Sequence, residues 1–419
     1  MISCNSEIGR LKSLIIHTPD EGIDRISPKH AEELLFDDIV YYPLMLKEYQ
    51  TYERVLQICL GSENVHQVKQ LLQESISIET KEKSELLTKI LIEEELPPSE
   101  KDYLEKLPSE TLAHILVTGY DADRDIILFD PIPNFMFTRD IAVTVNDGII
   151  VTKAAKSARW RENLLTRMII ATHPLFDESR QAGKVINLNR PELFPPSKYG
   201  ERVSVEGGDV MMIHKDYLLV GVSERSTQHG FNLLRDKLFE IGLVTNVVKI
   251  NIPKDRSCMH IDTIFTQVDK HDLVCFKPIV YDGLGSNVEV YNQNGTVKTY
   301  GSVKDFFHKE IDPKMNFIFA GGGYSPYQDR EQWTDGCNLL TIKPGVAISY
   351  DRNQLTAKEF AKAGYTIIDA NDFIEKYQAI DNPLDTIEKL IIALPSSELS
   401  RARGGSHCMS MPLVREPLT

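Results

Sequence analysis

The sequence predicts a mixed α/β fold, because short β-rich runs alternate with helical patterns from Asp125 onward. Several neighbouring runs are close enough in the chain to form hairpins, so we expect mixed sheets and not a doubly wound parallel sheet. The β-rich runs are residues 126–129, 141–145, 149–152, 218–222, 247–252, 273–276, 317–320, 346–350 and 366–369. The helical patterns among them are residues 230–241, 358–363 and 370–377.

Before this region, one predicted strand leads into a long helical stretch. Residues 10–20 hold a short β-rich run that ends at a proline turn, which is typical of a strand. From Lys29 to Val117 the sequence is acidic and leucine-rich, with apolar residues at helical spacing. Ser99, directly after two prolines, is a predicted helix start and cap. The pattern fits a helical bundle inserted after the first strand, and it fits helices that flank the sheet equally well.

The run from Ile141 to Val151 is a predicted hairpin, because Asn146-Asp147-Gly148 separates two β-rich segments. The sequence contains no exact repeat. Repeated strand–strand–helix units would nevertheless fit its rhythm.

Length and charge limit the functions that the sequence supports. The 419 residues allow one large domain or two to three ordinary ones, and 42% apolar with 26% charged residues are typical of a soluble globular protein. A net charge of −14 disfavours nucleic acid or an anionic membrane surface as a partner, because both require a basic face. The same charge weakly favours a small cationic substrate.

The cysteines and the N-terminus indicate a reducing compartment. Six cysteines are scattered without a C-x-x-C pair, which is typical of reduced thiols and not of disulfides or a zinc site. The N-terminal residues lack a basic stretch followed by an apolar run, and no apolar run approaches the ~18 residues of a membrane span. We therefore expect a cytoplasmic protein.

The C-terminal tail, residues 403–412, carries one cysteine behind a pair of glycines and before a proline. Glycine permits close approach of the backbone to a ligand, and Pro412 keeps a helix from enclosing the Cys408 thiol. Arg403 and His407 would favour a thiolate. Because free cysteines are mostly small buried hydrophobes, this loop alone does not establish catalysis.

Three further polar clusters lie at predicted strand ends or in glycine turns, where sites tend to be built. They are residues 133–140, residues 205–210 with 221–225, and residues 258–263. Asn134 and Asp140 could instead be turn formers, and Glu206-Gly207-Gly208-Asp209 could be a bulge between strands. A strand would place His260 and Asp262 on one face, as metal ligands, a structural pair or a catalytic pair.

The residue types of the four clusters favour one kind of chemistry. Carboxylates beside a thiolate suit a planar guanidinium, because paired, charge-assisted hydrogen bonds between these groups are strong and directional. They suit ester or peptide hydrolysis poorly, since that reaction develops negative charge on oxygen and requires donors. The hypothesis is that a cysteine attacks the guanidinium carbon while a histidine moves protons to the departing amine. Water would then hydrolyse a covalent S-alkylthiouronium.

The four clusters, in this order, resemble the signature of arginine deiminases. The matching segments are Asn134 to Asp140, Glu206-Gly207-Gly208-Asp209, Met259 to Thr263 and Arg403 to Pro412, accompanied by residues 34–38, 330–336 and 350–353. The resemblance spans essentially the whole chain. Four separated motifs in one order are a highly specific signal.

The resemblance implies a five-bladed α/β propeller, the pentein fold of guanidine-modifying enzymes, in residues 1–28 and 121–419. An inserted α-helical bundle domain would comprise residues 29–120. The implied reaction is hydrolysis of free L-arginine to L-citrulline and ammonia, without a metal or organic cofactor, which disfavours the metal interpretation of His260 and Asp262. The family forms dimers or larger oligomers, so we also expect a homodimer or larger homo-oligomer.

The resemblance also implies roles for individual residues. Cys408 would be the nucleophile and His260 the general acid and base, with Glu206 orienting the histidine. Asp140 and Asp262 would bind the guanidinium. The family positions that hold the amino-acid end of the substrate, with three cations suited to an α-carboxylate, are Asn134, Arg159, Arg225 and Arg403.

Two departures from the family pattern bear on the substrate more than on the chemistry. Ile141 follows Asp140 where arginine deiminases often have proline. Residues 152–161 differ from the usual family sequence, although Arg159 is retained and Arg161 lies nearby.

Other outcomes on the same fold stay open. They are an arginine dihydrolase that makes ornithine and two ammonia, a citrulline hydrolase and an amidinotransferase, which differ in water access and acceptor. A peptidyl-arginine substrate is disfavoured, because three arginines suit a free carboxylate. A non-catalytic arginine-binding protein would be favoured by loss of the cysteine or histidine, and both are present. A third alternative is a structural or interaction protein that uses the acidic helical stretch, although charge alone usually marks a solvated face.

Overall fold

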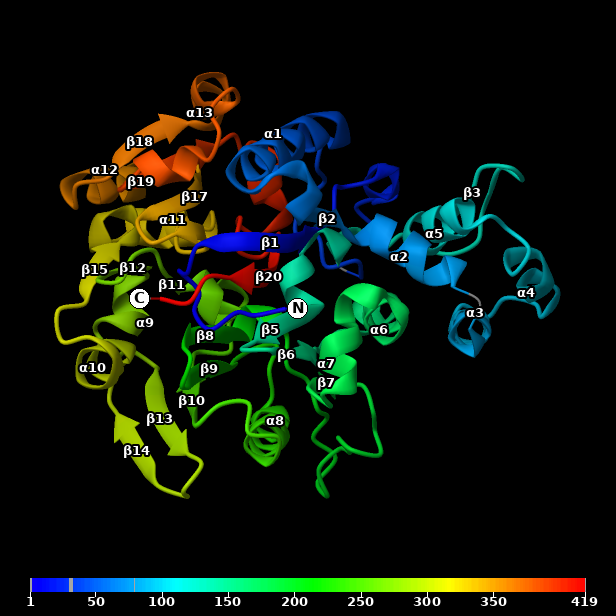
Figure 1. Ribbon diagram of the computed structural model, residues 1–419, viewed down its shortest axis with the longest axis horizontal. Coiled ribbons are helices and arrows are strands. Elements are labelled where there is room, and N and C mark those ends of the chain that lie inside the picture. The colour runs from blue at the N-terminus through cyan, green and yellow to red at the C-terminus, as the bar shows by residue number, and fades with distance from the viewer. Residues whose placement is uncertain (1, 30–32, 79, 419) are drawn as a thin grey trace.

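The computed structural model describes residues 2–29, 33–78 and 80–418. The protein is a mixed α/β structure, as the sequence predicts, in which several small sheets pack side by side with helices toward the periphery (Figure 1). The predicted propeller also includes residues 1 and 419, and the predicted helical insert includes residues 30–32 and 79. These positions lie outside the described residues.

Five sheets of the described chain share one arrangement, in which an antiparallel pair is joined by a third strand parallel to one of the pair. This recurrence matches the strand–strand–helix rhythm of the sequence. Their strands are β2 (Val65–Gln67), β1 (Leu11–Ile16) and β20 (Met411–Arg415); β5 (Ala142–Val145), β6 (Gly148–Val151) and β7 (Val185–Asn187); β8 (Val210–His214), β9 (Tyr217–Val222) and β10 (Asn246–Asn251), extended by β13 (Asn287–Asn292) and β14 (Val297–Tyr300); β11 (Phe265–Gln267), β12 (Asp272–Cys275) and β15 (Asn316–Phe319); and β16 (Leu340–Lys343), β17 (Val346–Tyr350), β19 (Leu390–Leu394) and β18 (Thr366–Asp369).

Most predicted strands are present within one or two residues of their predicted bounds. The run 126–129 is the exception, since only β4 (Ile126–Ile127) forms there, paired with β3 (Tyr120–Asp121). The predicted hairpin is confirmed by the pairing of β5 with β6. At its turn, Asn146 takes a φ of 50°, a left-handed conformation that asparagine tolerates better than most residues.

The helices of the α/β part cover the sheets through apolar faces. Helix α8 (Gln228–Glu240) begins after Thr227, whose side chain accepts a hydrogen bond from the Gly230 N–H as an N-cap. Its Phe231, Leu234 and Leu238 recur at helical spacing and are buried among the side chains of β8 to β10. The other helices here are α6 (Trp160–Thr172), α7 (Asp177–Gln181), α9 (Lys277–Val280), α10 (Val303–Phe306), α11 (Tyr327–Trp333), α12 (Gln354–Lys362) and α13 (Ala370–Tyr377).

The helical stretch after β1 divides into two parts. Helix α1 (Tyr42–Leu60) packs against α13 and shares a core cluster with β16, β17 and β19. Helices α2 (Val68–Ser77) to α5 (Ser109–Thr118) share a second cluster with α6 and project away from the sheets (Figure 1). The remaining two helices of this projection are α3 (Lys81–Glu93) and α4 (Ser99–Leu104). The bounds 29–120 of an inserted domain stay a prediction.

Two local predictions about helices and the membrane can be compared with the structure directly. Helix α4 begins at Ser99 as predicted. The prediction that Ser99 caps the helix is wrong, because Pro98 occupies the N-cap position and no side chain caps that end. Among the helices of the described residues, none has both the length and the apolar character that crossing a membrane requires.

The four predicted motifs occupy corresponding places in four sheets, each on a turn directly before a strand. Short 3₁₀ helices, Thr138–Asp140, Gly207–Asp209 and Ile261–Thr263, precede β5, β8 and β11, and the cysteine tail precedes β20. The prediction that His260 and Asp262 share one face of a strand is therefore wrong, as is the alternative of a β-bulge at residues 206–209. These side chains lie on turns and not on strands, because polar residues and glycines interrupt the apolar runs at these positions.

Candidate active site

The turns that precede β5, β8, β11 and β20 touch one another. The Gly208 N–H donates to Asp140 Oδ1 at 3.1 Å, and the Arg139 N–H donates to the Cys408 carbonyl at 3.0 Å. The Cys408 thiol in turn lies 3.4 Å from Asp262 Oδ2. Motifs far apart in the sequence therefore meet at one place.

A cavity of about 30 Å³ lies at this junction. All of the predicted site residues except Asp262 line it, and Asp262 contacts the thiol directly. The lining residues are Leu35, Asn134, Phe137, Asp140, Arg159, Glu206, Arg225, Arg256, Met259, His260, Thr263, Ala402, Arg403 and Cys408. The volume is enough for a water molecule or two, so a larger ligand requires lining side chains to move apart.

Asn338 holds the Cys408 residue at two points. Its side-chain N–H donates to Sγ at 3.1 Å, and its carbonyl oxygen accepts from the Cys408 N–H at 3.1 Å. Burial raises the pKa of the Cys408 thiol well above its ordinary value, and the charges of Asp262 and Asp140 raise it further. The thiol is therefore protonated in the free protein at neutral pH.

The expectation that Arg403 and His407 favour a thiolate is wrong for this arrangement. His407 pairs through Nδ1 with Asp262 Oδ2 at 2.9 Å, and its Nε2 lies 3.3 Å from Glu7 Oε2. The Arg403 guanidinium stacks over the Trp333 ring at 3.3 Å. Both side chains are engaged with groups other than the thiol, so a thiolate needs a positive charge placed beside it.

His260 and Glu206 form a buried ion pair. His260 Nε2 donates to Glu206 Oε2 at 2.8 Å, while Nδ1 faces Asp140 at 3.9 Å and Asp262 at 4.0 Å. Burial by itself would lower the pKa of His260, but Asp140 and Glu206 raise it to about 10. Burial would likewise raise the pKa of Glu206, and the hydrogen bond and charge of His260 instead lower it to about 2. The imidazole is protonated at neutral pH and can act as an acid.

Two glycines allow this close packing. A Cβ on Gly208 would lie 2.5 Å from His260 Nδ1, and a Cβ on Gly405 would lie 2.3 Å from the backbone carbonyl oxygen of Asn338 and 2.7 Å from its side-chain Oδ1. All of these distances are shorter than any side chain tolerates. The glycines of the predicted motifs are therefore needed for space at the histidine and at the asparagine that holds the cysteine.

Arg159 is engaged by protein groups on all sides. Its guanidinium donates to Asp140 Oδ2 at 2.6 Å, to Glu162 Oε2 at 2.7 Å and to the Asn134 carbonyl at 3.1 Å. The Asn134 side chain donates to the Leu34 carbonyl at 2.7 Å. Both residues line the cavity, and in this arrangement Arg159 orients Asp140. Their predicted contact with a substrate stays a prediction.

Arg225 and Arg403 have guanidinium donor atoms without a hydrogen-bond partner among the described residues. Buried Arg225 Nε and Arg403 Nε and Nη1 have no hydrogen-bond partner within the part of the chain that the structure describes. Arg225 Nη1 lies 3.8 Å from Glu206, and Arg403 Nη1 lies 3.9 Å from Asp37, both too long for hydrogen bonds. Unsatisfied guanidinium donors in a buried cavity suit an anionic group of a ligand.

Asp37 lies at the rim of the cavity and comes from the segment 34–38. Arg256 donates to its carboxylate from Nη2 at 2.8 Å and from Nε at 3.3 Å. Arg403 approaches the same carboxylate from the tail. This segment, which accompanies the family motifs in the sequence, therefore contacts both the histidine loop and the cysteine loop.

Asp140, Glu206 and His260 bring one potential metal-ligand atom each within 4.8 Å of one another. A protonated imidazole cannot donate a lone pair to a metal ion, and the pKa of His260 is raised to about 10. Glu206 is already the hydrogen-bond acceptor of that imidazole. The three side chains fit an acid–base pair with a neighbouring carboxylate better than a metal centre.

The sequence prediction missed Asn338, Asp335 and Arg256. Asn338 lies directly before β16, the fifth corresponding turn, and only two residues beyond the quoted segment 330–336. Asp335 is buried with a φ of 63°, and burial raises the pKa of its carboxyl to about 7 although Arg403 opposes this. The recurrence of polar turns before each sheet is the signal that could have found Asn338.

Comparison with known sequences identifies the family of the chain. A family description, arginine deiminase, matches residues 103–415. A relative named arginine deiminase from Borrelia garinii subsp. bavariensis is 30% identical over 447 aligned positions, covering 100% of this chain and 98% of its own. One from Listeria monocytogenes serotype 4b is 31% identical over 443 positions, with the same coverage.

Solved structures share the fold at low sequence identity. The N-terminal domain of ArgZ, an arginine dihydrolase from cyanobacteria, gives a TM-score of 0.53 at 13% identity, covering 97% of this chain and 99% of that one. Dimethylarginine dimethylaminohydrolase from Pseudomonas aeruginosa, complexed with citrulline, gives 0.50 at 16% identity, covering 96% and 100%. These are α/β enzymes of the pentein fold, and the fold is what such a likeness establishes. Since the family match covers most of the sequence and the relatives align from end to end, the chain belongs to the arginine deiminase family.

Proposed function

We propose that the protein hydrolyses free L-arginine to L-citrulline and ammonia through a covalent thiouronium on Cys408. The observation that carries this proposal is the buried thiol beside two carboxylates, Asp140 and Asp262, and an acid–base pair, His260 and Glu206. A guanidinium between the two carboxylates would donate to both and present its central carbon to sulfur. Membership of the arginine deiminase family supports the same reaction.

Unpaired atoms in the cavity supply the binding argument. Asp262 Oδ1 is buried without a hydrogen-bond partner among the described residues, as an acceptor for a guanidinium N–H would be. The spare donors of Arg225 and Arg403 match the α-carboxylate at the other end of the substrate. Asn134 lines the same cavity, and its side-chain oxygen would accept a hydrogen bond from the α-ammonium, since its side-chain N–H already donates to Leu34. Binding would part the lining residues, which enclose only about 30 Å³.

The first chemical step needs a thiolate. The substrate cation would offset the carboxylates that raise the pKa of Cys408, so the thiol releases its proton to solvent when the guanidinium is in place. Sulfur then forms a bond to the guanidinium carbon. His260 donates its proton to one terminal nitrogen of the adduct, and the C–N bond breaks to release ammonia. A cationic S-alkylthiouronium remains on the cysteine.

The second step returns the enzyme to its starting form. His260 is now neutral and takes a proton from water, and the hydroxide bonds to the thiouronium carbon. The carbinol loses its hydroxyl proton to solvent as the C–S bond breaks, which yields citrulline and the thiolate. When citrulline leaves, the thiolate takes up a proton from solvent and the thiol of the free protein is restored. Glu206 keeps the imidazole in one orientation through both proton transfers, because its hydrogen bond to Nε2 leaves Nδ1 facing the carboxylates.

We also propose the division of the chain into a propeller and an inserted helical domain. The five recurrent sheets support a five-bladed α/β propeller, with the helices after the first strand as an inserted domain. The proposed insert keeps the bounds 29–120, with α1 packed on β16, β17 and β19 and α2 to α5 packed on α6. A homodimer or larger homo-oligomer and a cytoplasmic location remain expectations, the latter supported by six free cysteines.

The test is a product assay on the purified protein with L-arginine, measuring citrulline, ornithine and ammonia together. We expect citrulline and ammonia in equal amounts. Ornithine with two equivalents of ammonia would instead assign an arginine dihydrolase and implicate the altered residues after Asp140. Absence of turnover with arginine, but turnover of citrulline or an amidine acceptor, would overturn the proposed substrate. Acid quenching during turnover, followed by mass analysis of the tail peptide, should trap the adduct on Cys408.

A further inference from the structure

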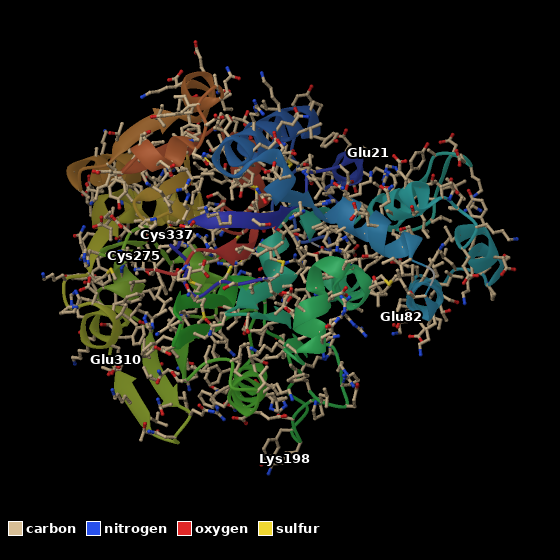
Figure 2. All side chains as sticks on the ribbon, viewed as in Figure 1. Glu21, Glu82, Lys198, Cys275, Glu310 and Cys337 are labelled. Atoms are coloured by element: carbon tan, nitrogen blue, oxygen red, sulfur yellow. The ribbon has the colours of Figure 1, made fainter. Side chains whose placement is uncertain are left out.

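A second cavity of about 720 Å³ shares a wall with the reactive pocket. Residues 153–157 and Trp160 line this second cavity, while Arg159 within the same segment lines the pocket. Its other walls come from α3, α6 and the loop between β7 and β8. Figure 2 labels Glu82 in the first turn of α3 and Lys198 in the loop between β7 and β8, the two segments that supply the lining residues Lys89 and Arg202. The segment 152–161 is also where the sequence departs from the family pattern.

The lining of this cavity is basic although the protein is acidic. Five cations line it against two carboxylates, Glu93 and Glu224, in a chain of net charge −14. The cations, counted over the described residues, are Lys89, Lys153, Lys156, Arg167 and Arg202. Lys156 is paired with Glu224 at 3.3 Å. This concentration of positive charge is local and is not explained by composition.

Four of the five cations have no carboxylate of their own. Within the described chain, Lys89, Lys153, Arg167 and Arg202 take part in no ion pair. The charge of Glu192 acts on Arg167, but that carboxylate is already bonded to Arg190 at 2.6 Å. Burial lowers the pKa of Lys153, and the charges of Arg202 and Arg167, which line the same cavity, lower it further. Folding has gathered like charges without a protein counter-ion.

We propose that this cavity binds a small phosphorylated molecule. A phosphate group carries more than one negative charge and several acceptor oxygens, which Lys153, Arg167 and Arg202 would contact together. The volume is in the range of pockets for small ligands, so it leaves room for an organic part beside the half-buried Trp160 ring. The proposal goes beyond the reaction at Cys408 and does not depend on it.

The wall between the two cavities couples this site to the reactive pocket. The Lys153 backbone exchanges two hydrogen bonds of 3.0 Å with Val205, and the Ala155 N–H donates to Glu206 Oε1 at 2.9 Å. A ligand that draws residues 153–156 toward the cavity therefore acts on the carboxylate that orients His260. Since coupling between two sites is reciprocal, arginine in the pocket should also change the affinity for the phosphorylated ligand.

The experiment is titration calorimetry with inorganic phosphate and with pyrophosphate, at constant ionic strength set with chloride. Wild type, Arg167→Gln and Arg202→Gln are compared with Lys314→Gln, which removes an exposed cation outside the cavity. We expect saturable binding by wild type and by Lys314→Gln. Each cavity variant should weaken binding about tenfold, because it removes one charge-assisted hydrogen-bond donor. Pyrophosphate should bind more tightly than phosphate if the organic part of the ligand is joined through a diphosphate.

Three results would overturn the proposal. They are absence of saturable binding, equal affinity in all four proteins, and a change of oligomeric mass in Arg202→Gln without phosphate binding, which would make the cavity a contact between copies. Circular dichroism of each variant checks that folding is retained. Because binding is measured without turnover, Cys408→Ser should bind phosphate as wild type does. Failure of the proposed reaction would therefore leave this result unaffected.

Discussion

The reactive pocket and the basic cavity share one segment of chain, residues 153–160, yet they treat charge in opposite ways. In the pocket nearly every charge has a partner, as in His260 with Glu206 and Arg159 with Asp140. What stays unpaired there are single atoms, such as Asp262 Oδ1 and Arg403 Nη1. In the cavity whole cations are unpaired. In both regions the unpaired groups indicate the charge of the ligand that would bind there. In the pocket the single unpaired atoms also indicate where that ligand would lie.

The two regions also differ in how strong an interaction between two charges is. The pocket encloses about 30 Å³ and its charged side chains are buried, so each interaction acts in a medium of low polarisability. The cavity encloses about 720 Å³ and its cations are partly exposed to solvent. We therefore expect large effects from substitutions in the pocket and small ones in the cavity, and the predictions below test that ranking.

Replacement of the nucleophile should have the largest effect. Cys408→Ser should lower kcat for arginine by on the order of 10⁵-fold, because an alcohol is a far weaker nucleophile than a thiolate. Thermal unfolding should change little, since oxygen can keep the contact with Asn338. The measurement is single-turnover kinetics, with Cys59→Ser as a buried-thiol control. Residual turnover within tenfold of wild type would contradict the covalent mechanism.

Removal of the histidine's partner should come next. Glu206→Gln should lower kcat by about 10²- to 10⁴-fold, because the imidazole loses both its orientation and the carboxylate that supports its protonated form. It should also destabilise the fold by about 3 kcal/mol, the cost of leaving one member of a buried ion pair unpaired. Denaturant unfolding and the pH–rate profile measure the two effects. An unchanged profile would remove Glu206 from the proton-transfer pair.

The same ion pair predicts how stability changes with pH. Folding raises the pKa of His260 from 6.5 to about 10, so its contribution is complete below pH 6.5 and is lost as pH rises through 10. Folding lowers the pKa of Glu206 from 4.5 to about 2, so its contribution is complete above pH 4.5 and is lost as pH falls through 2. The free energy of unfolding should therefore fall between pH 7 and pH 10, and this slope should shrink in Glu206→Gln.

Loss of an arginine that we propose binds the α-carboxylate should have an intermediate effect. Arg403→Ala should raise KM for arginine by about 10- to 100-fold, in line with one or two charge-assisted hydrogen bonds, and leave kcat/KM for agmatine nearly unchanged, because agmatine lacks the α-carboxylate. Arg225→Ala should behave alike. The exposed neighbour Arg401, which pairs with Asp38, provides the control Arg401→Ala. Equal losses for both ligands would show that these arginines act on the fold.

The smallest effect should come from the cavity, with the opposite sign. Lys153→Met should leave stability unchanged or raise it by a few tenths of a kcal/mol, because it removes repulsion from Arg167 and Arg202. Lys249, whose ammonium pairs with Glu289 at 2.9 Å, supplies the matched variant Lys249→Met, which should destabilise. Chemical denaturation in phosphate-free buffer checks both. A marked loss of stability in Lys153→Met would mean that the cavity already holds a counter-charge.

Much of the fold could be predicted because the responsible interactions are local. The alternation of β-rich and helical runs located β1, β5, β6, β9, β10, β12, β15, β17 and β18, and the Asn146 turn located a hairpin. The other strands of the five sheets, among them β8, β11, β16 and β20 beside the candidate site, were not predicted. The run 126–129 failed because half of it has no strand partner, which depends on neighbours and not on its own residues. The strand expected at His260 failed for a related reason, since the chain forms a 3₁₀ helix there, Ile261–Thr263, before β11 begins.

The residues of the candidate site could also be predicted, but not what each one faces. All nine predicted side chains lie at the junction of the turns. Arg159, expected at the substrate, is held by Asp140 and Glu162, and His407, expected at the thiol, is turned toward Asp262 and Glu7. Asn338 was missed because its contact with Cys408 spans 70 residues of sequence.

The sequence by itself determined the residue types, the order of the motifs and the periodicities from which the strands and helices follow, since these depend on neighbours along the chain. Only the tertiary structure decided which charges are paired, why the thiol is protonated, and that three cations gather behind the segment 153–160. The physical reason is that pairing and pKa depend on distance and burial in space. Cys408 and Asp262 lie 3.4 Å apart but are separated by 146 residues, and no local pattern encodes that approach.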